Sequence, residues 1–222
     1  TLDWHRRAKQ ENAMFLVDAV QAYGKIAVAG ADMLAVSAHK LNGPKGVGAL
    51  ILRQGLDISP LSLGGGQEMG RRSGTENLIG IAGFGSAAQA ASQDLANGVW
   101  EQVAQLRNIL ENSLDLGGNV TILVGKGAPR LPNTTCLVTP GWKGETQVMQ
   151  MDLAGFAVSA GSACSSGKVN KASRVLLAMG FDEITASSAI RVSMGSTTTE
   201  AEVMAFADAW KDAYRRRKAR AA

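Results

Sequence analysis

Three polar side chains of this sequence follow short apolar segments that could be neighbouring strands of a parallel sheet. Asp18 follows the run MFLV, and His39 and Lys40 follow the run that begins at Met33. Because ligands of open α/β sheets bind at the carboxyl ends of the strands, we expect these three side chains to face one crevice. In a partly dry crevice, desolvation favours the neutral amine, which is a nucleophile toward carbonyl groups. The spacing therefore predicts an acid–base or Schiff-base site, although Asp18 alone also fits a turn cap and Lys40 alone a surface residue.

Cys164 lies in SAGSACSSG, a segment of small residues without apolar packing partners. Such a cysteine is expected to be exposed and mobile, as a nucleophile that travels between two sites must be. Cys136, in the apolar segment TTCLV, is expected to be a small core residue. No CxxC pair or nearby histidine accompanies Cys164, so no metal site is predicted.

Two further segments could bind anions. Arg191 lies in AIRVS, a predicted strand, and a buried arginine there would require an anionic partner. A carboxylate matches the guanidinium in bidentate geometry, and it could belong to a substrate or to a structural Asp or Glu. The stretch GGGQEMGRRSGT, which ends at Thr75, offers N–H groups, two arginines and hydroxyls that could hold a phosphate. A loop of that length is usually functional or part of an interface.

Alternating strands and helices must position these residues. The composition changes near Asn97-Gly98, which predicts one domain over residues 1–96 and a second over 97–222. In the first we expect strands at 14–17, 33–36 and 47–52 and a helix at about 76–96. In the second we expect strands at 120–124, 135–138, 157–159 and 189–193, with helices at 99–114, 145–153, 173–179 and from Thr199. Thr199 and Glu202 form a capping box for the last helix.

Composition excludes several classes of protein. No run of eighteen apolar residues is present, so no membrane-spanning helix is expected, and the first fifteen residues resemble neither a signal nor a transit peptide. Two cysteines cannot form a disulfide framework, and they favour a reducing, cytoplasmic location. The net charge of +4 is concentrated near the end, in RRRKAR. A solvated helix end explains that run better than a nucleic-acid or membrane partner does.

The strings VDAVQAYGK, SAHKLNGPKGVGAL, GGGQEMGRRSGTEN, SAGSACSSGKV and AIRVSMGSTTTEAE occur in this order. Together they resemble the cysteine desulfurases of the class V aminotransferase family, in the branch with a long catalytic-cysteine loop. The resemblance runs from about Met14 to Trp210. It implies an α/β protein of the pyridoxal-phosphate-dependent transferase fold type I. Residues 1–96 would be the C-terminal part of the large domain, with an incomplete sheet, and residues 97–222 the small C-terminal α/β or α+β domain.

The resemblance also implies a cofactor, pyridoxal 5'-phosphate, and residues that hold it. Lys40 would bind the cofactor covalently and then move the substrate Cα proton. Asp18 would pair with the pyridinium nitrogen, and Gln21 would bond near the ring O3′. Ser37 and His39 would contact the phosphate.

The remaining roles concern the substrate and a second subunit. Arg191 would bind the carboxylate of L-cysteine, and Cys164 would take the sulfur as a persulfide, leaving L-alanine. Thr75 would reach the phosphate of a neighbouring subunit, which implies a homodimer. The sulfur would pass to an acceptor or iron–sulfur scaffold protein, for iron–sulfur cluster biogenesis or thiolation.

The sequence departs from the family pattern in two ways. Leu16 stands where many relatives have histidine. The family also has a long segment before the position of Thr1, with a stacking histidine and further cofactor ligands, so this chain resembles the C-terminal portion only. We therefore expect the chain alone to bind the cofactor weakly or not at all. Two other functions fit the same motifs, namely a selenocysteine lyase and a non-catalytic module that docks a sulfur acceptor.

Overall fold

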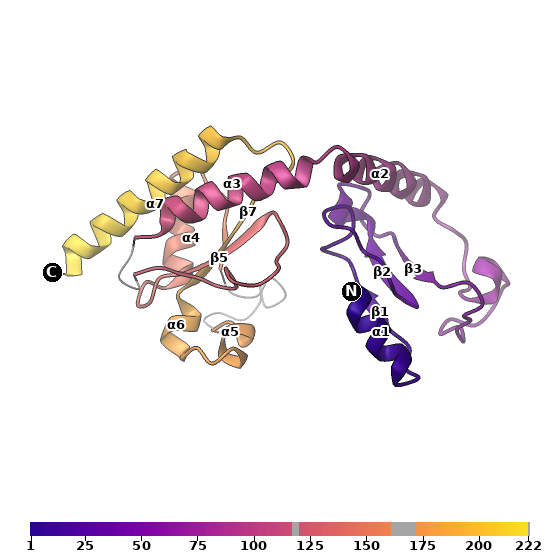
Figure 1. The fold of residues 1–222 in the computed structure, drawn as a ribbon. Coiled ribbons are helices and arrows are strands. Elements are labelled where there is room, and N and C mark those ends of the chain that lie inside the picture. The colour runs from indigo at the N-terminus through magenta and orange to yellow at the C-terminus, as the bar shows by residue number, and fades with distance from the viewer. Residues whose placement is uncertain (117–119, 161–171, 222) are drawn as a thin grey trace. The chain divides into compact units, whose positions relative to one another are not determined.

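Two separate sheets organise the chain, one of three strands and one of four. The computed structural model describes residues 1–116, 120–160 and 172–221 (Figure 1). Each sheet belongs to its own unit, Thr1–Gly98 or Val99–Ala222. The division falls two residues beyond the position expected from composition. Within the described residues, no helix is long and apolar enough to cross a membrane.

The first sheet joins strands β1 (Leu16–Asp18), β2 (Met33–Ser37) and β3 (Gly48–Leu52) in the order β1-β2-β3. β1 and β2 are parallel, as the apolar runs predicted, and β3 returns antiparallel beside β2. The helical elements of this unit are α1 (Leu2–Gln10), η1 (Ala38–Leu41), η2 (Gln67–Gly70) and α2 (Leu78–Ala96).

The core of the first unit is built from small residues. Ala19 and Ala38 are fully buried, and Val36 and Leu41 are nearly so. Gly24 allows α2 to approach closely, because a Cβ at Gly24 would lie 2.7 Å from the Cβ of Ala91. Gly24 also has a φ of +74°, a conformation that glycine adopts without steric cost.

A buried carboxylate, Asp32, binds the residue just before β1 and the residue just after β3. Its Oδ2 accepts a hydrogen bond from the backbone N–H of Phe15 at 3.0 Å, and its Oδ1 accepts one from Arg53 Nε at 2.7 Å. The Phe15 N–H and then the Arg53 guanidinium hold the pKa of Asp32 below its ordinary value. His5 Nε2, from α1, lies 3.7 Å from the same carboxylate. Asp32 therefore links α1 to both outer strands at one end of the sheet, opposite the carboxyl ends of β1 and β2.

The second sheet is antiparallel throughout, in the order β4-β5-β7-β6. Its strands are β4 (Ile122–Leu123), β5 (Thr134–Val138), β6 (Ser159–Ala160) and β7 (Ala189–Ser193). The helices are α3 (Val99–Leu114), α4 (Gly144–Leu153), α5 (Arg174–Ala178), α6 (Glu183–Ser187) and α7 (Glu200–Ala221). Strands expected over 120–124 and 157–159 are shorter or displaced in the structure, and α6 was not predicted. A helix of five residues is too short to show a periodic pattern.

The main core of the second unit lies between the sheet and the helices α3, α4 and α7. Figure 1 shows α3 and α7 running side by side, and residues of both belong to one buried cluster. Its centre is Trp210, fully buried, whose Nε1 donates to Gln147 Oε1 at 3.0 Å. Gln147 in turn donates to the carbonyl oxygens of Trp142 and Ser188. A smaller cluster under α5 and α6 includes Val138, Leu176, Ala186 and Ala189.

Candidate active site

The carboxyl end of β1 presents Asp18 to solvent. Asp18 is paired in register with Ala35 of β2, and the next residue, Ala19, donates its N–H to the Ala35 carbonyl at 2.9 Å. Asp18 Oδ1 accepts a hydrogen bond from the Val20 N–H at 3.0 Å. Asp18 therefore caps the turn after β1, which is one of the two roles expected from the sequence. Its side chain is also exposed, so a ligand can reach it.

Two residues after Ala35, β2 ends at Ser37 and turns into η1. In this short helix residues three apart share a face, so Ala38 and Leu41 are buried while His39 and Lys40 are exposed. Asn42, with a φ of 61°, ends the turn.

Ser37 and His39 form a pair. The Ser37 Oγ lies 2.9 Å from His39 Nδ1, at the carboxyl end of β2. The parallel register of β1 and β2 therefore brings Asp18, His39 and Lys40 to one edge of the sheet, as the sequence predicted, and Ser37 lies there with them.

Lys40 is exposed. The described residues of the first unit therefore do not bury its amine in the partly dry crevice that the sequence predicted. A second lysine, Lys25, is electrostatically coupled to Lys40. Burial, and then the positive charge of Lys40, lower the pKa of Lys25. Lys25 Nζ donates to the backbone carbonyl of Gln21 at 3.1 Å. Lys25 was not singled out from the sequence, although it closes the string VDAVQAYGK that contains Asp18 and Gln21.

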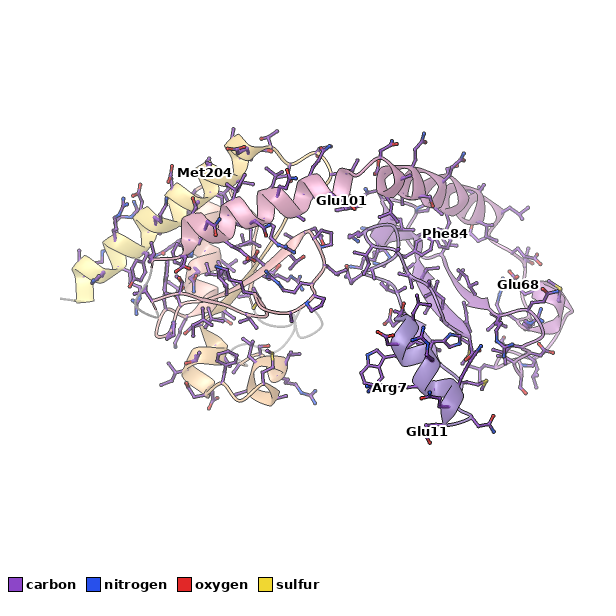
Figure 2. The ribbon with its side chains drawn as sticks, in the orientation of Figure 1. Arg7, Glu11, Glu68, Phe84, Glu101 and Met204 are labelled. Carbon is purple, nitrogen blue, oxygen red and sulfur yellow. The ribbon has the colours of Figure 1, made fainter. Side chains whose placement is uncertain are left out.

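Gln21 and Thr75 are both exposed. Thr75 follows the loop that contains η2, where Glu68 and Met69 have the positive φ angles 51° and 55° (Glu68 is labelled in Figure 2). The two arginines of this loop contact the loop itself. Arg71 Nε donates to Asp57 at 3.0 Å, and Arg72 donates to the carbonyl oxygens of Ser73 and Gly74. These hydrogen bonds hold the loop to itself and to Asp57, and Thr75 at its end is exposed.

The expectation that Arg191 is buried was wrong. Side chains alternate along β7, so Ile190 and Val192 point into the core while Arg191 and Ser193 are exposed. Arg191 donates to Ser159 Oγ at 3.4 Å, and within the described part of the chain no carboxylate pairs with it. A structural Asp or Glu partner is therefore not seen among those residues.

Cys164 lies outside the described residues. Cys136 is half-buried beside the smaller core cluster of the second unit, much as its apolar strand predicted. Burial raises the pKa of the Cys136 thiol, and the nearby Arg191 charge opposes that rise. Cys136 is a poor nucleophile in this setting, because the thiolate is the reactive form.

Residues 3–206 match the family model described as aminotransferase class V. The chain belongs to this family. A cysteine desulfurase of Klebsiella pneumoniae is 42% identical over 200 residues, which cover 88% of this chain and 50% of that protein. A cysteine desulfurase of Bradyrhizobium diazoefficiens is 44% identical over 204 residues, which cover 90% of this chain and 50% of that protein. The chain thus spans about half the length of the curated relatives it matches.

Solved structures give the same family fold. A NifS-like protein from Rickettsia africae superposes with a TM-score of 0.85 at 33% identity, over 96% of this chain and 57% of that one. A second NifS-like protein gives a TM-score of 0.82 at 35% identity. The expected α/β architecture of fold type I is therefore confirmed.

Proposed function

We propose that this chain carries the lysine, the acid and the acceptor cysteine of a cysteine desulfurase, which converts L-cysteine to L-alanine. The observation that carries the proposal is the edge of the first sheet, where Asp18, Ser37, His39 and Lys40 follow two parallel strands. Its support is the class V aminotransferase family and relatives named cysteine desulfurase.

The chemistry of these donors fits pyridoxal 5'-phosphate. An exposed primary amine (Lys40) suits an aldehyde, an exposed carboxylate (Asp18) suits a pyridinium nitrogen, and the Ser37–His39 pair suits a phosphate. When bound, this cofactor supplies an electron sink for negative charge at the substrate Cα. Gln21 would bond near the ring oxygen, and Thr75 would reach the phosphate of a second copy of the chain in a homodimer.

Three protein groups would act on the substrate. Lys40 would take the Cα proton, since its amine is exposed where the two strands end. Arg191 would bind the substrate carboxylate, and its exposed guanidinium supports this role. Cys164 would attack the sulfur of L-cysteine as a thiolate.

The transfer of sulfur is balanced within one turnover. The Cys164 Sγ–S bond forms as the substrate Cβ–S bond breaks, and the electron pair of that bond stays with the substrate. Protonation of the substrate then gives L-alanine, while the enzyme keeps the sulfur as a persulfide. No external oxidant is needed. The persulfide would pass to an acceptor such as an iron–sulfur scaffold protein, in the reducing cytoplasm.

The proposal is tested by joining this chain to the half of the Klebsiella pneumoniae cysteine desulfurase that it does not match. We expect the chimera to form alanine from L-cysteine, and Lys40→Ala to abolish this while Lys45→Ala, an exposed lysine of the next turn, leaves it intact. Cys164→Ser should stop alanine formation from cysteine. Alanine formation that survives either Lys40→Ala or Cys164→Ser contradicts the mechanism. Faster turnover of selenocysteine that is insensitive to Cys164→Ser would favour a selenocysteine lyase.

A further inference from the structure

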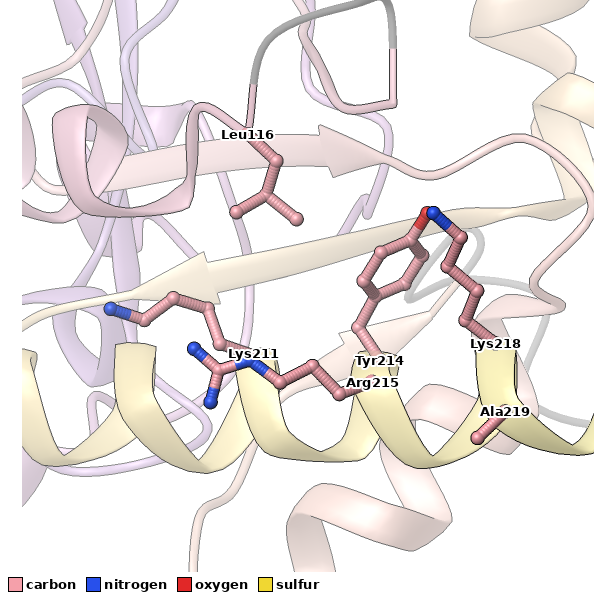
Figure 3. Close-up of a pocket in the computed structure, with 6 residues that line it drawn as sticks. All are labelled: Leu116, Lys211, Tyr214, Arg215, Lys218 and Ala219. Carbon is pink, nitrogen blue, oxygen red and sulfur yellow. The ribbon is translucent and has the colours of Figure 1, made fainter.

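The last turns of α7 and Leu116, which follows α3, line an open cavity of about 450 Å³ that the proposed chemistry does not use. Its walls are Leu116, Lys211, Tyr214, Arg215, Lys218 and Ala219 (Figure 3). Figure 3 shows the side chains of Lys211, Tyr214, Arg215 and Lys218 extending from α7, with Leu116 facing them from the other segment. The volume lies within the range of pockets that hold small ligands or single side chains.

The apolar wall is rigid. The Tyr214 ring stacks on Trp210 with centroids 5.8 Å apart and planes 3° apart, and it also lies 5.9 Å from the ring of Trp142. Both tryptophans are almost completely buried, and Trp210 is fixed by its hydrogen bond to Gln147. A ligand therefore meets a preformed surface, which reduces the ordering cost of binding.

The rim of the cavity is cationic. Lys211, Arg215 and Lys218 are spaced i, i+4 and i+7, so they lie on one face of α7. Two carboxylates offset part of this charge, since Asp208 pairs with Lys211 at 2.8 Å and Asp212 pairs with Arg215 at 2.7 Å.

Other cations outnumber those two carboxylates. Within the described part of the chain Lys218 has no ion pair, and Arg216, Arg217 and Arg220 add further positive charge nearby. On the cavity face itself three cations stand against two carboxylates, so Lys218 leaves an excess of positive charge beside the apolar cavity.

We propose that this cavity binds a short acidic peptide segment of a partner protein, with an apolar side chain inserted between Leu116 and Tyr214. Carboxylates on either side of that anchor would meet Lys218 and Arg215. An apolar cavity gains free energy only when apolar atoms fill it, and a cationic rim selects acidic neighbours.

A nucleic acid fits these features less well. Its backbone would use the cations of α7 but leave the apolar cavity unfilled, because phosphates carry no apolar anchor. An anionic membrane would use the whole cationic surface of the helix, including Arg216, rather than the cavity face. The cavity therefore favours a peptide over either.

Binding of a fluorescent ten-residue peptide, with one leucine flanked by glutamates, tests the proposal on the full chain without cofactor or cysteine. Failure here would leave the desulfurase proposal untouched. We expect saturable binding that weakens about tenfold in Lys218→Glu, as for loss of a close interfacial charge pair. Leu116→Asp should weaken it comparably. Arg216→Glu is the matched control, because Arg216 is an exposed cation of the same helix that does not line the cavity.

Three results would overturn the proposal. The first is an equal loss in Arg216→Glu and Lys218→Glu, which would mean that charge alone attracts the peptide. The second is equal binding of a peptide with alanine in place of leucine. The third is tighter binding of a single-stranded RNA or of phosphatidylserine vesicles with the same dependence on Lys218. Circular dichroism of each variant ensures that a loss of binding is not a loss of fold.

Discussion

At the scale of single residues, the charged groups inside the second unit matter for stability as a function of pH. Glu111 is almost completely buried on α3, where both carboxylate oxygens accept from Arg130, at 2.8 and 3.0 Å. Thr135 Oγ1 of β5 donates to the same carboxylate at 2.8 Å. Burial alone would raise the pKa of Glu111, but the bonds from Arg130 and Thr135 outweigh it and hold the pKa below its ordinary value.

The sign of this shift gives a prediction. Because the folded pKa of Glu111 is lowered, the ionised group stabilises the fold above its ordinary pKa. This contribution is lost as the pH falls through the folded value. Glu111→Gln should cost about 2–3 kcal/mol near neutral pH, since Arg130 loses its buried partner. Urea unfolding from pH 7 to pH 3 should show a smaller acid-induced loss in the variant. A parallel decline in both proteins would contradict the assignment.

Residue roles were predictable from sequence only where position in an element decided them. Asp18 and Lys40 could be assigned to a sheet edge because each follows an apolar run. Arg191 could not, because AIRVS fits both a strand buried on two faces and one with alternating faces. Lys25 was missed for a different reason. Its coupling to Lys40 depends on how the turn after β1 packs, and no local pattern encodes that packing.

At the scale of elements, the start of α7 was predictable in detail because its signal is local. Glu202 Oε2 accepts from the Thr199 N–H at 2.8 Å, and Thr199 Oγ1 accepts from the Glu202 N–H at 3.3 Å. Thr199→Ala should lower the free energy of unfolding by about 1 kcal/mol. Thr197→Ala, an exposed threonine of the preceding loop, is the control and should be nearly neutral. Equal effects of the two substitutions would show that the reciprocal cap does not stabilise the helix.

Packing of α2 against the turn after β1 makes a second prediction at this scale. Gly24→Ala should destabilise the first unit through two effects, a left-handed φ and a contact with Ala91. Gly55 has a similar φ of +81° but open space around it, so Gly55→Ala measures the backbone effect alone, about 1 kcal/mol. Gly24→Ala should lower the free energy of unfolding, measured by chemical denaturation, clearly more than Gly55→Ala does. In an Ala91→Gly background this extra loss should disappear, because the contact with the Ala91 Cβ is gone. Identical costs for the two alanine variants would mean that α2 does not press on this turn.

At the scale of the whole molecule, the family fold was predictable from five motifs in order, because each motif belongs to a different element of the sheets and loops. The extents of short elements were not. β4 and β6 have two residues each, and their pairing depends on β5 and β7 rather than on their own sequence. The loop around Cys164 lies outside the described residues, so its predicted exposure stays a prediction.

The whole-molecule prediction concerns cofactor affinity. In the first unit Asp18, His39 and Lys40 are exposed, and the chain spans about half the length of its curated relatives. A ring held only at one sheet edge loses most of the desolvation and stacking that make such sites tight. We therefore expect the 222-residue chain to bind pyridoxal 5'-phosphate weakly, and the chimera with the Klebsiella half to bind it tightly. Absorbance titration and mass spectrometry after borohydride reduction check this, with the added mass on Lys40 and absent in Lys40→Ala. Tight, Lys40-dependent binding by the chain alone would show that the described sheet edge is sufficient to hold the cofactor.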